Sequence, residues 1–159
     1  YYASDSDGKA ELLPLEPGYP MTSQSNWNVS PESMYWGTKF YYERYKLPII
    51  ITENGHQNLD YPLLDGKVHD PQRIDYIYRY LRSLKKAISE GVDVRGYFHW
   101  TLMDNFEWAL GYSVRVGLVY VDFVSQKRVP KDSAKAYQKI IATNGECLDG
   151  EFPYTVTIG

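Results

Sequence analysis

Short β-branched runs alternate with helical stripes along this chain. The run Pro48–Thr52 is apolar on both faces, as in a buried parallel strand, and Val92–Trp100 predicts a second strand. Between them, Asp70-Pro71 opens a predicted helix that ends at Gly91. Its apolar positions recur with the spacing of an amphipathic helix and are Ile74, Ile77, Leu81, Leu84 and Ile88.

Two more helices are predicted outside this pair of strands. Ser30-Pro31-Glu32 supplies a capping hydroxyl, a proline at the first helical position and an acid in the first turn, and this helix should reach about Tyr45. Pro130-Lys131-Asp132 opens the last helix, which Asn144-Gly145 ends. The side chains spaced for packing are Met34, Tyr35, Thr38, Tyr41, Tyr42 and Tyr45 in the first and Ala134, Tyr137 and Ile141 in the last.

The order of these elements favours an α/β fold. Tyr1–Ser4 is interpreted as the end of a strand, and the polar stretch that follows, with glycines and prolines up to Pro20, as a long loop. Leu118–Val121 predicts a short extended piece near the surface. Strands alternating with helices predict a parallel sheet in which the two full strands are neighbours. A closed (β/α)₈ barrel needs about 250 residues, so this chain supplies about three of its eight units.

Polar and aromatic side chains follow both full strands. Glu53, in Thr52-Glu53-Asn54-Gly55, comes directly after the first strand, although a lone glutamate there is more often a helix-cap or ion-pair acid. The second strand leads through Trp100 into a loop that contains Asp104, Asn105, Glu107 and Trp108. Indole rings can cover the apolar face of a sugar, and a carboxylate can accept two hydroxyl hydrogen bonds. In α/β barrels the chemistry lies at these strand ends, so the cluster favours a carbohydrate site over a pair of tryptophans buried in a loop.

Composition narrows the function classes. Aromatic residues make up 16% of the chain, with 16 Tyr and 4 Trp, which fits a sugar site or a large aromatic core equally well. The net charge of −3 argues against a nucleic-acid partner, and no apolar run approaches the roughly 18 residues of a membrane span. The single cysteine, Cys147, excludes an internal disulfide and favours a cytoplasmic location. His56, His69 and His99 are scattered, which is more typical of structural residues than of metal ligands.

Several stretches together resemble family 1 of the glycoside hydrolases. Ile49–Gly55 resembles the nucleophile motif at barrel strand seven, and Gly96–Trp108 resembles the strand-eight motif. Tyr1-Tyr2 resembles the end of strand six, while Val68–Ile74 and Gly117–Asp122 are further family-like stretches. The resemblance implies the C-terminal part of a (β/α)₈ TIM barrel, from the end of strand six to helix eight, and a retaining β-glycosidase similar to β-glucosidases. It implies no metal and no organic cofactor.

The resemblance also implies roles for the residues of the two strand ends. Glu53 resembles the nucleophile that forms a glycosyl-enzyme, and Tyr2 the phenol that hydrogen-bonds and steers it. Asn54 is interpreted as support for that carboxylate rather than a reacting group.

Four other positions resemble the family's contacts with the β-glycoside substrate. Glu107 resembles the acceptor for two distal hydroxyls of the nonreducing sugar, and Trp108 the indole N–H donor beside it. Trp100 resembles the platform under that sugar, and Trp27 the tryptophan on the leaving-group side.

Two departures from the family pattern matter. Val116 stands where relatives usually carry an aromatic residue, which should widen the entrance of the site. The Asn-Glu-Pro acid/base motif is absent, and retaining hydrolysis needs two carboxyl groups about 5–5.5 Å apart. Residues 1–159 are therefore predicted to be the C-terminal segment of a single barrel domain, inactive without the N-terminal part. The segment should be found with that part or with another copy of itself, since its sheet would otherwise have open edges.

Three alternatives to the leading interpretation stay open. A 6-phospho-β-glycosidase would need a cation or a helix N-terminus near the sugar's 6-position, where Glu107 would instead repel a phosphate. A thioglucosidase keeps the nucleophile but can lack the acid/base glutamate. A non-catalytic sugar-binding module would keep the tryptophans and Glu107 without turnover.

Overall fold

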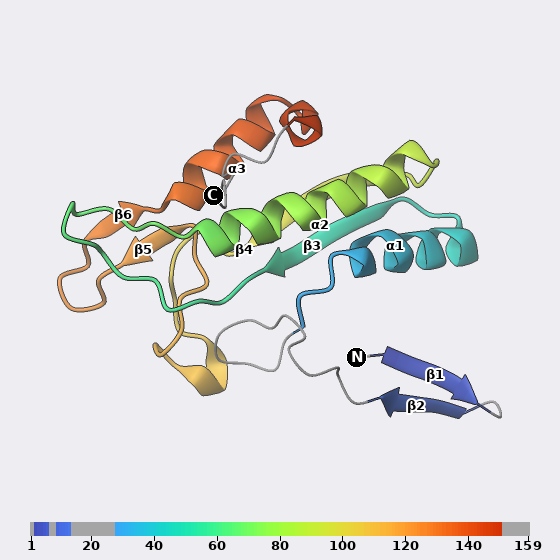
Figure 1. Cartoon of the computed structure of the whole chain (residues 1–159), viewed down its shortest axis with the longest axis horizontal. Coiled ribbons are helices and arrows are strands. Elements are labelled where there is room, and N and C mark those ends of the chain that lie inside the picture. Colours follow the sequence, from blue (N-terminus) through green and yellow to red (C-terminus); the bar gives the residue numbers. More distant parts are fainter. Residues whose placement is uncertain (1, 7–8, 14–27, 151–159) are drawn as a thin grey trace, which may run out of the picture.

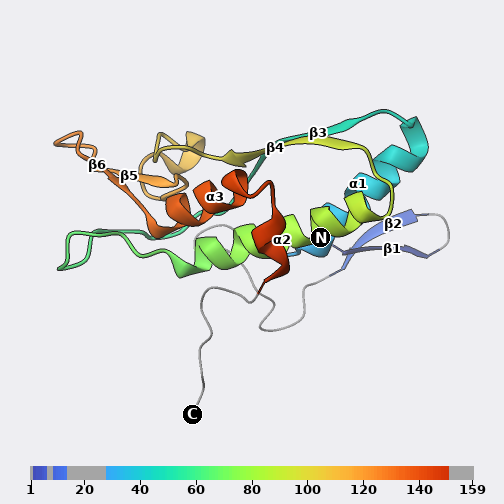
Figure 2. The same cartoon turned by 90° about the horizontal axis from the view of Figure 1, so that it is seen from above.

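The computed structural model describes residues 2–6 and 9–13 by their backbone, and residues 28–150 in full. Its centre is a parallel pair of strands, β3 (Ile49–Gly55) and β4 (Val94–Trp100). Helix α2 (Pro71–Ser89) connects the two strands, and α2 and α3 (Asp132–Ala142) lie on one side of them (Figures 1 and 2). The predicted adjacency of the two strands is confirmed, and so is the order of helices around them.

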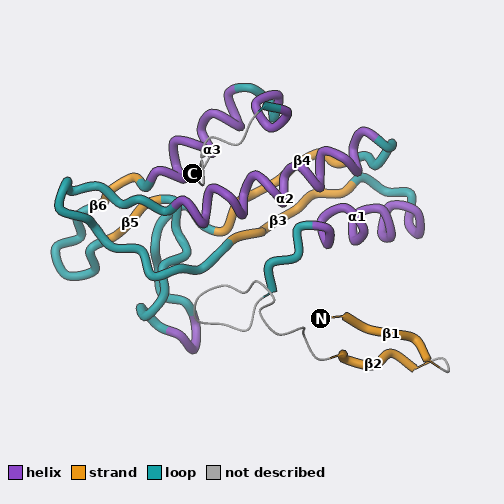
Figure 3. The backbone as a smooth tube through the Cα atoms, viewed as in Figure 1, coloured by secondary structure: helices purple, strands orange, loops and turns teal. Residues whose placement is uncertain are grey.

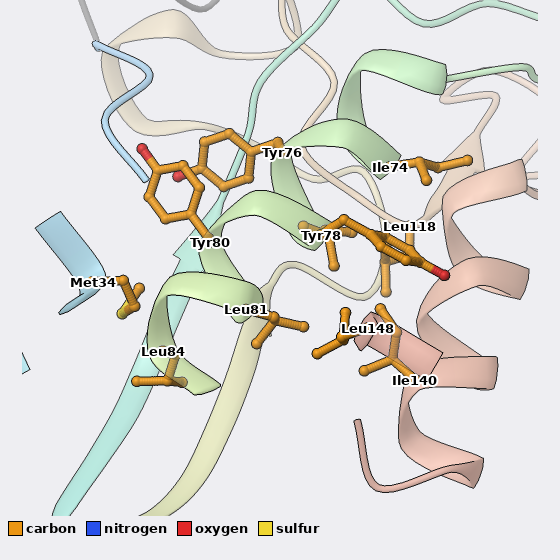
Figure 4. Packing of buried hydrophobic residues seen from close by; sticks show 11 residues of the cluster. Met34, Ile74, Tyr76, Tyr78, Tyr80, Leu81, Leu84, Leu118, Ile140 and Leu148 are labelled. Carbon is orange, nitrogen blue, oxygen red and sulfur yellow. The ribbon is translucent and has the colours of Figure 1, made fainter. Parts of the chain in front are cut away.

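Helix α2 packs as its apolar stripe predicts. Four of its five stripe positions are buried, whereas Ile88, in the last turn, is exposed. Together with Ile140 and Leu148 they belong to the main core (Figure 4). Ile51 and Tyr97 from the strands pack against this core. Burial of each large aliphatic side chain stabilises the fold by about 1.5–3 kcal/mol.

The two flanking helices pack only part of their predicted faces. In α1 (Glu32–Tyr45) the first turns bury Met34, Tyr35 and Thr38. Further along, Tyr42 is half-buried against Ala87 and Val92, whereas Tyr41 and Tyr45 are exposed. In α3 the buried apolar side chain is Ile140, whereas Ile141 is exposed, so the prediction for Ile141 was wrong. Ile140 continues the three-residue spacing of Ala134 and Tyr137 toward the core, and Ile141 is turned away from it.

The long loop predicted after Tyr1–Ser4 was wrong at its start. Residues Tyr2–Ser6 (β1) and Lys9–Leu13 (β2) form an antiparallel hairpin in which Ser6 pairs with Lys9. The sequence between them is Asp7-Gly8, a typical two-residue hairpin connection. Local pairing of this kind closes a very short loop, so β1 pairs with β2 and not with β3.

The segment after β4 contains a 3₁₀ turn, η1 (Trp108–Leu110), and a small hairpin of β5 (Val119–Val121) and β6 (Arg128–Pro130). A second 3₁₀ turn, η2 (Glu146–Asp149), follows α3. The extended piece at Leu118–Val121 is present, but Leu118 and Val121 are buried rather than near the surface. Leu118 belongs to the same core as α2 and α3.

A buried cluster of ion pairs ties the loops at the carboxyl ends of the strands to α2 and α3. Lys131 Nζ lies 2.6 Å from Asp60 Oδ2 and 2.9 Å from Asp104 Oδ1, and Arg73 Nε lies 2.9 Å from Asp70 Oδ2. Arg73 also binds Asp60. All five side chains are almost fully shielded from solvent, and removing one member of such a pair leaves an uncompensated charge. The cluster therefore fixes the loops that follow β3 and β4.

Candidate active site

A cleft of about 540 Å³ opens at the carboxyl ends of β3 and β4. In Figure 3 the loops that follow these two strands run to the same end of the sheet. The residues that line the cleft are Glu53, Asn54, Gly55, His56, Gln57, Tyr76, Trp100, Glu107, Trp108 and Val116. The predicted meeting of Glu53 and Trp108 in one cleft is therefore observed.

Glu53 is presented by an irregularity near the end of β3. Ile51 pairs with Tyr97 and Asn54 pairs with His99, so β3 has one residue more than β4 in this interval. Two residues in succession, Thr52 and Glu53, are consequently exposed, although a regular strand would turn them to opposite faces. The bulge directs the Glu53 carboxylate into the cleft.

The next residue, Asn54, is held from two sides. Its Nδ2 donates a hydrogen bond of 3.0 Å to the hydroxyl of Tyr76 in α2, and its Oδ1 accepts one of 2.9 Å from the hydroxyl of Tyr97 in β4. Burial raises the pKa of both tyrosines, so both hydroxyls stay neutral. The interpretation of Asn54 as a supporting residue agrees with these contacts.

Glu107 and Trp108 reach the cleft from the loop after β4. The backbone N–H of Glu107 donates to the carbonyl of Gly111 at 2.7 Å, which closes the loop around η1. The side chain of Glu107 is half-buried, and its Oε2 is shielded yet has no hydrogen-bond partner within the described residues. Trp108 is 82% exposed. A shielded carboxylate oxygen beside an exposed indole can accept a hydroxyl hydrogen bond from a ligand.

Trp100 and Val116 complete the rim. Trp100 is the last residue of β4, and its peptide bond to Thr101 is cis. The carbonyl of Val116 accepts a hydrogen bond of 3.1 Å from the Thr101 N–H, which brings the later segment against the strand end. Val116 is buried but contributes to the lining, so its small side chain does shape the cleft.

Asp104 does not belong to the cleft, contrary to its place in the predicted cluster. Its carboxylate is buried, bonds to Lys131 and accepts a hydrogen bond of 2.9 Å from the Gly117 N–H. A carboxylate bound this closely to a buried lysine fixes the loop that carries Glu107 rather than contacting a ligand. Asn105 bonds to its own loop at the carbonyl of Met103.

Three lining residues were missed from the sequence. His56 and Gln57 directly follow the strand that carries Glu53, a position that could have indicated them. Tyr76 lies beside the apolar stripe of α2 and belongs to the core, so no signal in the sequence marks it as a lining residue. Burial, with the nearby charge of Arg73, lowers the pKa of His56 to about 4, so this histidine is neutral at pH 7.

Two of the six predicted site residues lie outside what the structure describes. Tyr2 belongs to β1 by its backbone, but its side chain is outside the described atoms, and Trp27 is outside the described residues. The roles assigned to Tyr2 and Trp27 stay predictions.

The described residues contain no group of three or more His, Cys, Asp or Glu side chains that could hold a metal ion. Over the same residues, no helix has the length and hydrophobicity to cross a membrane.

Comparison with known proteins identifies the family. β-Glucosidase A of Thermotoga maritima is 46% identical over 142 residues, which are 89% of this chain and 32% of that protein. A 6-phospho-β-galactosidase of Streptococcus equi is 47% identical over 121 residues, 74% of this chain and 25% of that protein. The solved structure of the Thermotoga maritima β-glucosidase with castanospermine matches with a TM-score of 0.80 and 45% identity, over 89% of this chain and 32% of its own.

These matches also define the part of the fold that is present. The chain spans about a third of the length of the curated relatives it matches. Its strands and helices form the C-terminal portion of a (β/α)₈ barrel, as predicted. Because the model of Glycosyl hydrolase family 1 matches residues 4–146, the chain belongs to that family.

Proposed function

We propose that the complete protein hydrolyses β-glycosides with retention of configuration, and that Glu53 is the nucleophile. The observation that carries this proposal is the exposed Glu53 carboxylate in a cleft shared with Glu107 and two tryptophans. In the first step a carboxylate oxygen of Glu53 attacks the anomeric carbon and the aglycone leaves. Water then releases the sugar from the glycosyl-enzyme.

The other side chains of the cleft would bind the sugar. Glu107 accepts hydrogen bonds from two neighbouring hydroxyls, and its unpartnered Oε2 is suited to this. Trp108 donates its indole N–H beside it, and Trp100 covers the apolar face of the ring. Tyr2 would hydrogen-bond Glu53, and Trp27 would line the leaving-group side.

One carboxylate needed for this mechanism lies outside this chain. A retaining enzyme needs a second carboxyl group about 5–5.5 Å from the nucleophile, and Glu107 is assigned to the sugar hydroxyls. We therefore propose that residues 1–159 are the C-terminal segment of one barrel domain, that the segment alone is inactive, and that the rest of the barrel supplies the acid/base group.

The charge of the cleft favours a neutral sugar over a phosphorylated one. Among the described lining residues two are carboxylates and none is lysine or arginine, and His56 is neutral at pH 7. A 6-phosphate would need cations or helix N-termini in that place. The alternative of a 6-phospho-β-glycosidase is thus disfavoured, although one relative carries that activity in its name.

The test compares two chromogenic substrates on the complete protein, an aryl β-glucoside and an aryl 6-phospho-β-galactoside. The unphosphorylated glucoside should be the better substrate. The variant Glu53→Gln should fold and bind sugar but lose several orders of magnitude in turnover, because an amide neither attacks the anomeric carbon nor stabilises positive charge there.

Each rival predicts a different pattern in this assay. Near-normal turnover by Glu53→Gln would remove Glu53 as the nucleophile. No turnover by the unaltered protein, with sugar binding intact, would indicate a binding module. Preference for a thioglycoside would indicate a thioglucosidase.

A further inference from the structure

The bulge in β3 decides where Glu53 points. The pairs Ile51 with Tyr97 and Asn54 with His99 enclose two residues of β3 but one residue of β4. In a regular strand Glu53 would share the face of Ile51, which packs against the core under α2 and α3. The extra residue returns Asn54 to that covered face and leaves Glu53 on the open one.

We propose that Asn54, held between the hydroxyls of Tyr76 and Tyr97, is a positioning residue that keeps this bulge in place and so holds Glu53 in attacking geometry. The inference rests on the proposed role of Glu53 as nucleophile. It assigns the amide of Asn54 to protein contacts, since Nδ2 donates to Tyr76 and Oδ1 accepts from Tyr97.

The chemistry of the three groups fits this role. An asparagine amide donates from one end and accepts at the other, so it can bridge two tyrosine hydroxyls. Tyr97 precedes His99, the partner of Asn54 in the register, by two residues and therefore lies on the same face of β4. If the bulge were lost, Asn54 would turn to the open face and both hydrogen bonds would break. The bulged register is thus coupled to the two bonds.

The tyrosine on the α2 side is itself held. The rings of Tyr76 and Tyr80 stack with centroids 3.9 Å apart (Figure 4). The Tyr80 hydroxyl accepts a hydrogen bond of 2.9 Å from the Ser30 N–H. Three segments thereby converge on Asn54, namely β4, α2 and the approach to α1. Such support matters because side chains fixed by a second layer of contacts hold a reacting group more accurately.

The residue after Asn54 fixes the other end of the bulge. Gly55 pairs with Trp100, and a Cβ at position 55 would lie 1.8 Å from the Trp100 carbonyl oxygen. The two backbones therefore meet directly behind the bulge, and Glu53 lies between a paired position on each side.

The experiment measures attack by Glu53 separately from sugar binding, in the complete protein. The probe is 2-deoxy-2-fluoro-β-glucosyl fluoride, with which a carboxylate oxygen bonds to the anomeric carbon and fluoride leaves. The trapping rate constant at saturation reports the geometry of attack, and the half-saturating concentration reports binding. Circular dichroism checks the fold of each variant.

Asn54→Ala should lower the trapping rate constant about 10²-fold, the loss expected for a misplaced reacting group, with little change in half-saturation. Tyr97→Phe should lower it in the same direction by a smaller factor. The double variant should be no slower than Asn54→Ala alone, because the two residues act as one unit. The matched control is Tyr35→Phe, which removes a hydroxyl that donates to Glu90 at 2.6 Å, away from the cleft residues.

The inference would be overturned if Asn54→Ala were trapped with the same rate constant as Tyr35→Phe. It would also be overturned if the half-saturating concentration of Asn54→Ala rose by the same factor as its rate constant fell. If Asn54→Ala does not fold, Tyr97→Phe decides by the same two criteria. Glu53→Gln separates this inference from the proposed function. Normal trapping of that variant would defeat the proposed function, whereas no trapping with a normal Asn54→Ala defeats only the positioning role.

Discussion

Both faces of the β3–β4 sheet carry apolar side chains, but one face is packed against helices and the other is exposed to solvent. On one face Ile51 and Tyr97 pack against the core formed with α2 and α3. On the other face Ile50 is 54% exposed and Phe98 is 61% exposed. Strands that are apolar on both faces are usually packed against other elements on both sides. Within the described residues, only one face of this sheet is packed in that way. The difference indicates that the open face, which leads to Glu53, is completed by structure outside them.

The largest effect should be on the association state of residues 1–159 when they are expressed without the rest of the proposed barrel. Residues 1–159 expressed alone should associate with one another or with the upstream segment, because β3 and β4 each have an unpaired edge within the described sheet and an exposed apolar face. Sedimentation velocity on the segment, alone and mixed with the upstream part, measures this.

Two aspartate variants make that measurement specific to the open face. Phe98→Asp should weaken association, whereas Leu64→Asp, at a fully exposed loop leucine, should not. A well-folded monomer of the segment alone would contradict the comparison of the two faces.

On the packed side of the sheet, mutation of a buried charged residue should lower the free energy of unfolding, as mutation of a buried apolar residue would. Arg73→Met in the complete protein should lower the free energy of unfolding by about 3–5 kcal/mol, because it leaves buried aspartates unpaired. Arg79→Met is the control on the same helix, since Arg79 pairs with Asp75 at 2.9 Å in solvent and should cost under about 1 kcal/mol. Urea unfolding measures both, and equal losses would show that the buried cluster is not what holds this side together.

The smallest expected effect is on the pH dependence of stability, through the partly exposed His69 near the start of α2. Hydrogen bonds to Asp132 first and Asp65 second raise the pKa of His69 above its usual value. Charged His69 therefore stabilises the fold below its unfolded pKa of about 6.5, and this contribution disappears as pH rises through the folded value. Thermal unfolding of the complete protein and of His69→Gln between pH 5.5 and 9 should differ at the acidic end and converge at the alkaline end.

The control for this profile is Arg79→Gln, which removes an exposed ion pair with Asp75 and leaves His69 and its two aspartates unchanged. A difference between His69→Gln and the unaltered protein that stays constant with pH would exclude the titration of His69 as its cause.

Residue periodicity predicted the elements that have strong local signals. The stripe of α2 and the β-branched run of β3 are of this kind, and they placed Glu53 and Trp108 at one end of the sheet. The hairpin of β1 and β2 was not predicted, because the glycines and prolines up to Pro20 favoured a loop there. Partial burial of α1 could not be predicted either, since a helical stripe does not say how far its neighbours extend.

The hydrogen bonds and ion pairs that hold the site in place could not be predicted from the sequence, for a different reason. Asn54 and Tyr97 are 43 residues apart, and their hydrogen bond depends on a one-residue register shift that no side-chain pattern records. Lys131 and Asp60, separated by 71 residues, likewise resemble ordinary surface charges until the fold buries them together. Long-range polar contacts of this kind follow from tertiary structure rather than from local preference.

The approach of Gly55 to the Trp100 carbonyl sets a limit on laboratory evolution of this protein. Any side chain at position 55 would have to force the ends of β3 and β4 apart. A library that randomises the cleft would therefore lose folded members at this position, whereas Thr52, which is exposed, can be exchanged without such a clash. Libraries of cleft variants should therefore keep glycine at position 55.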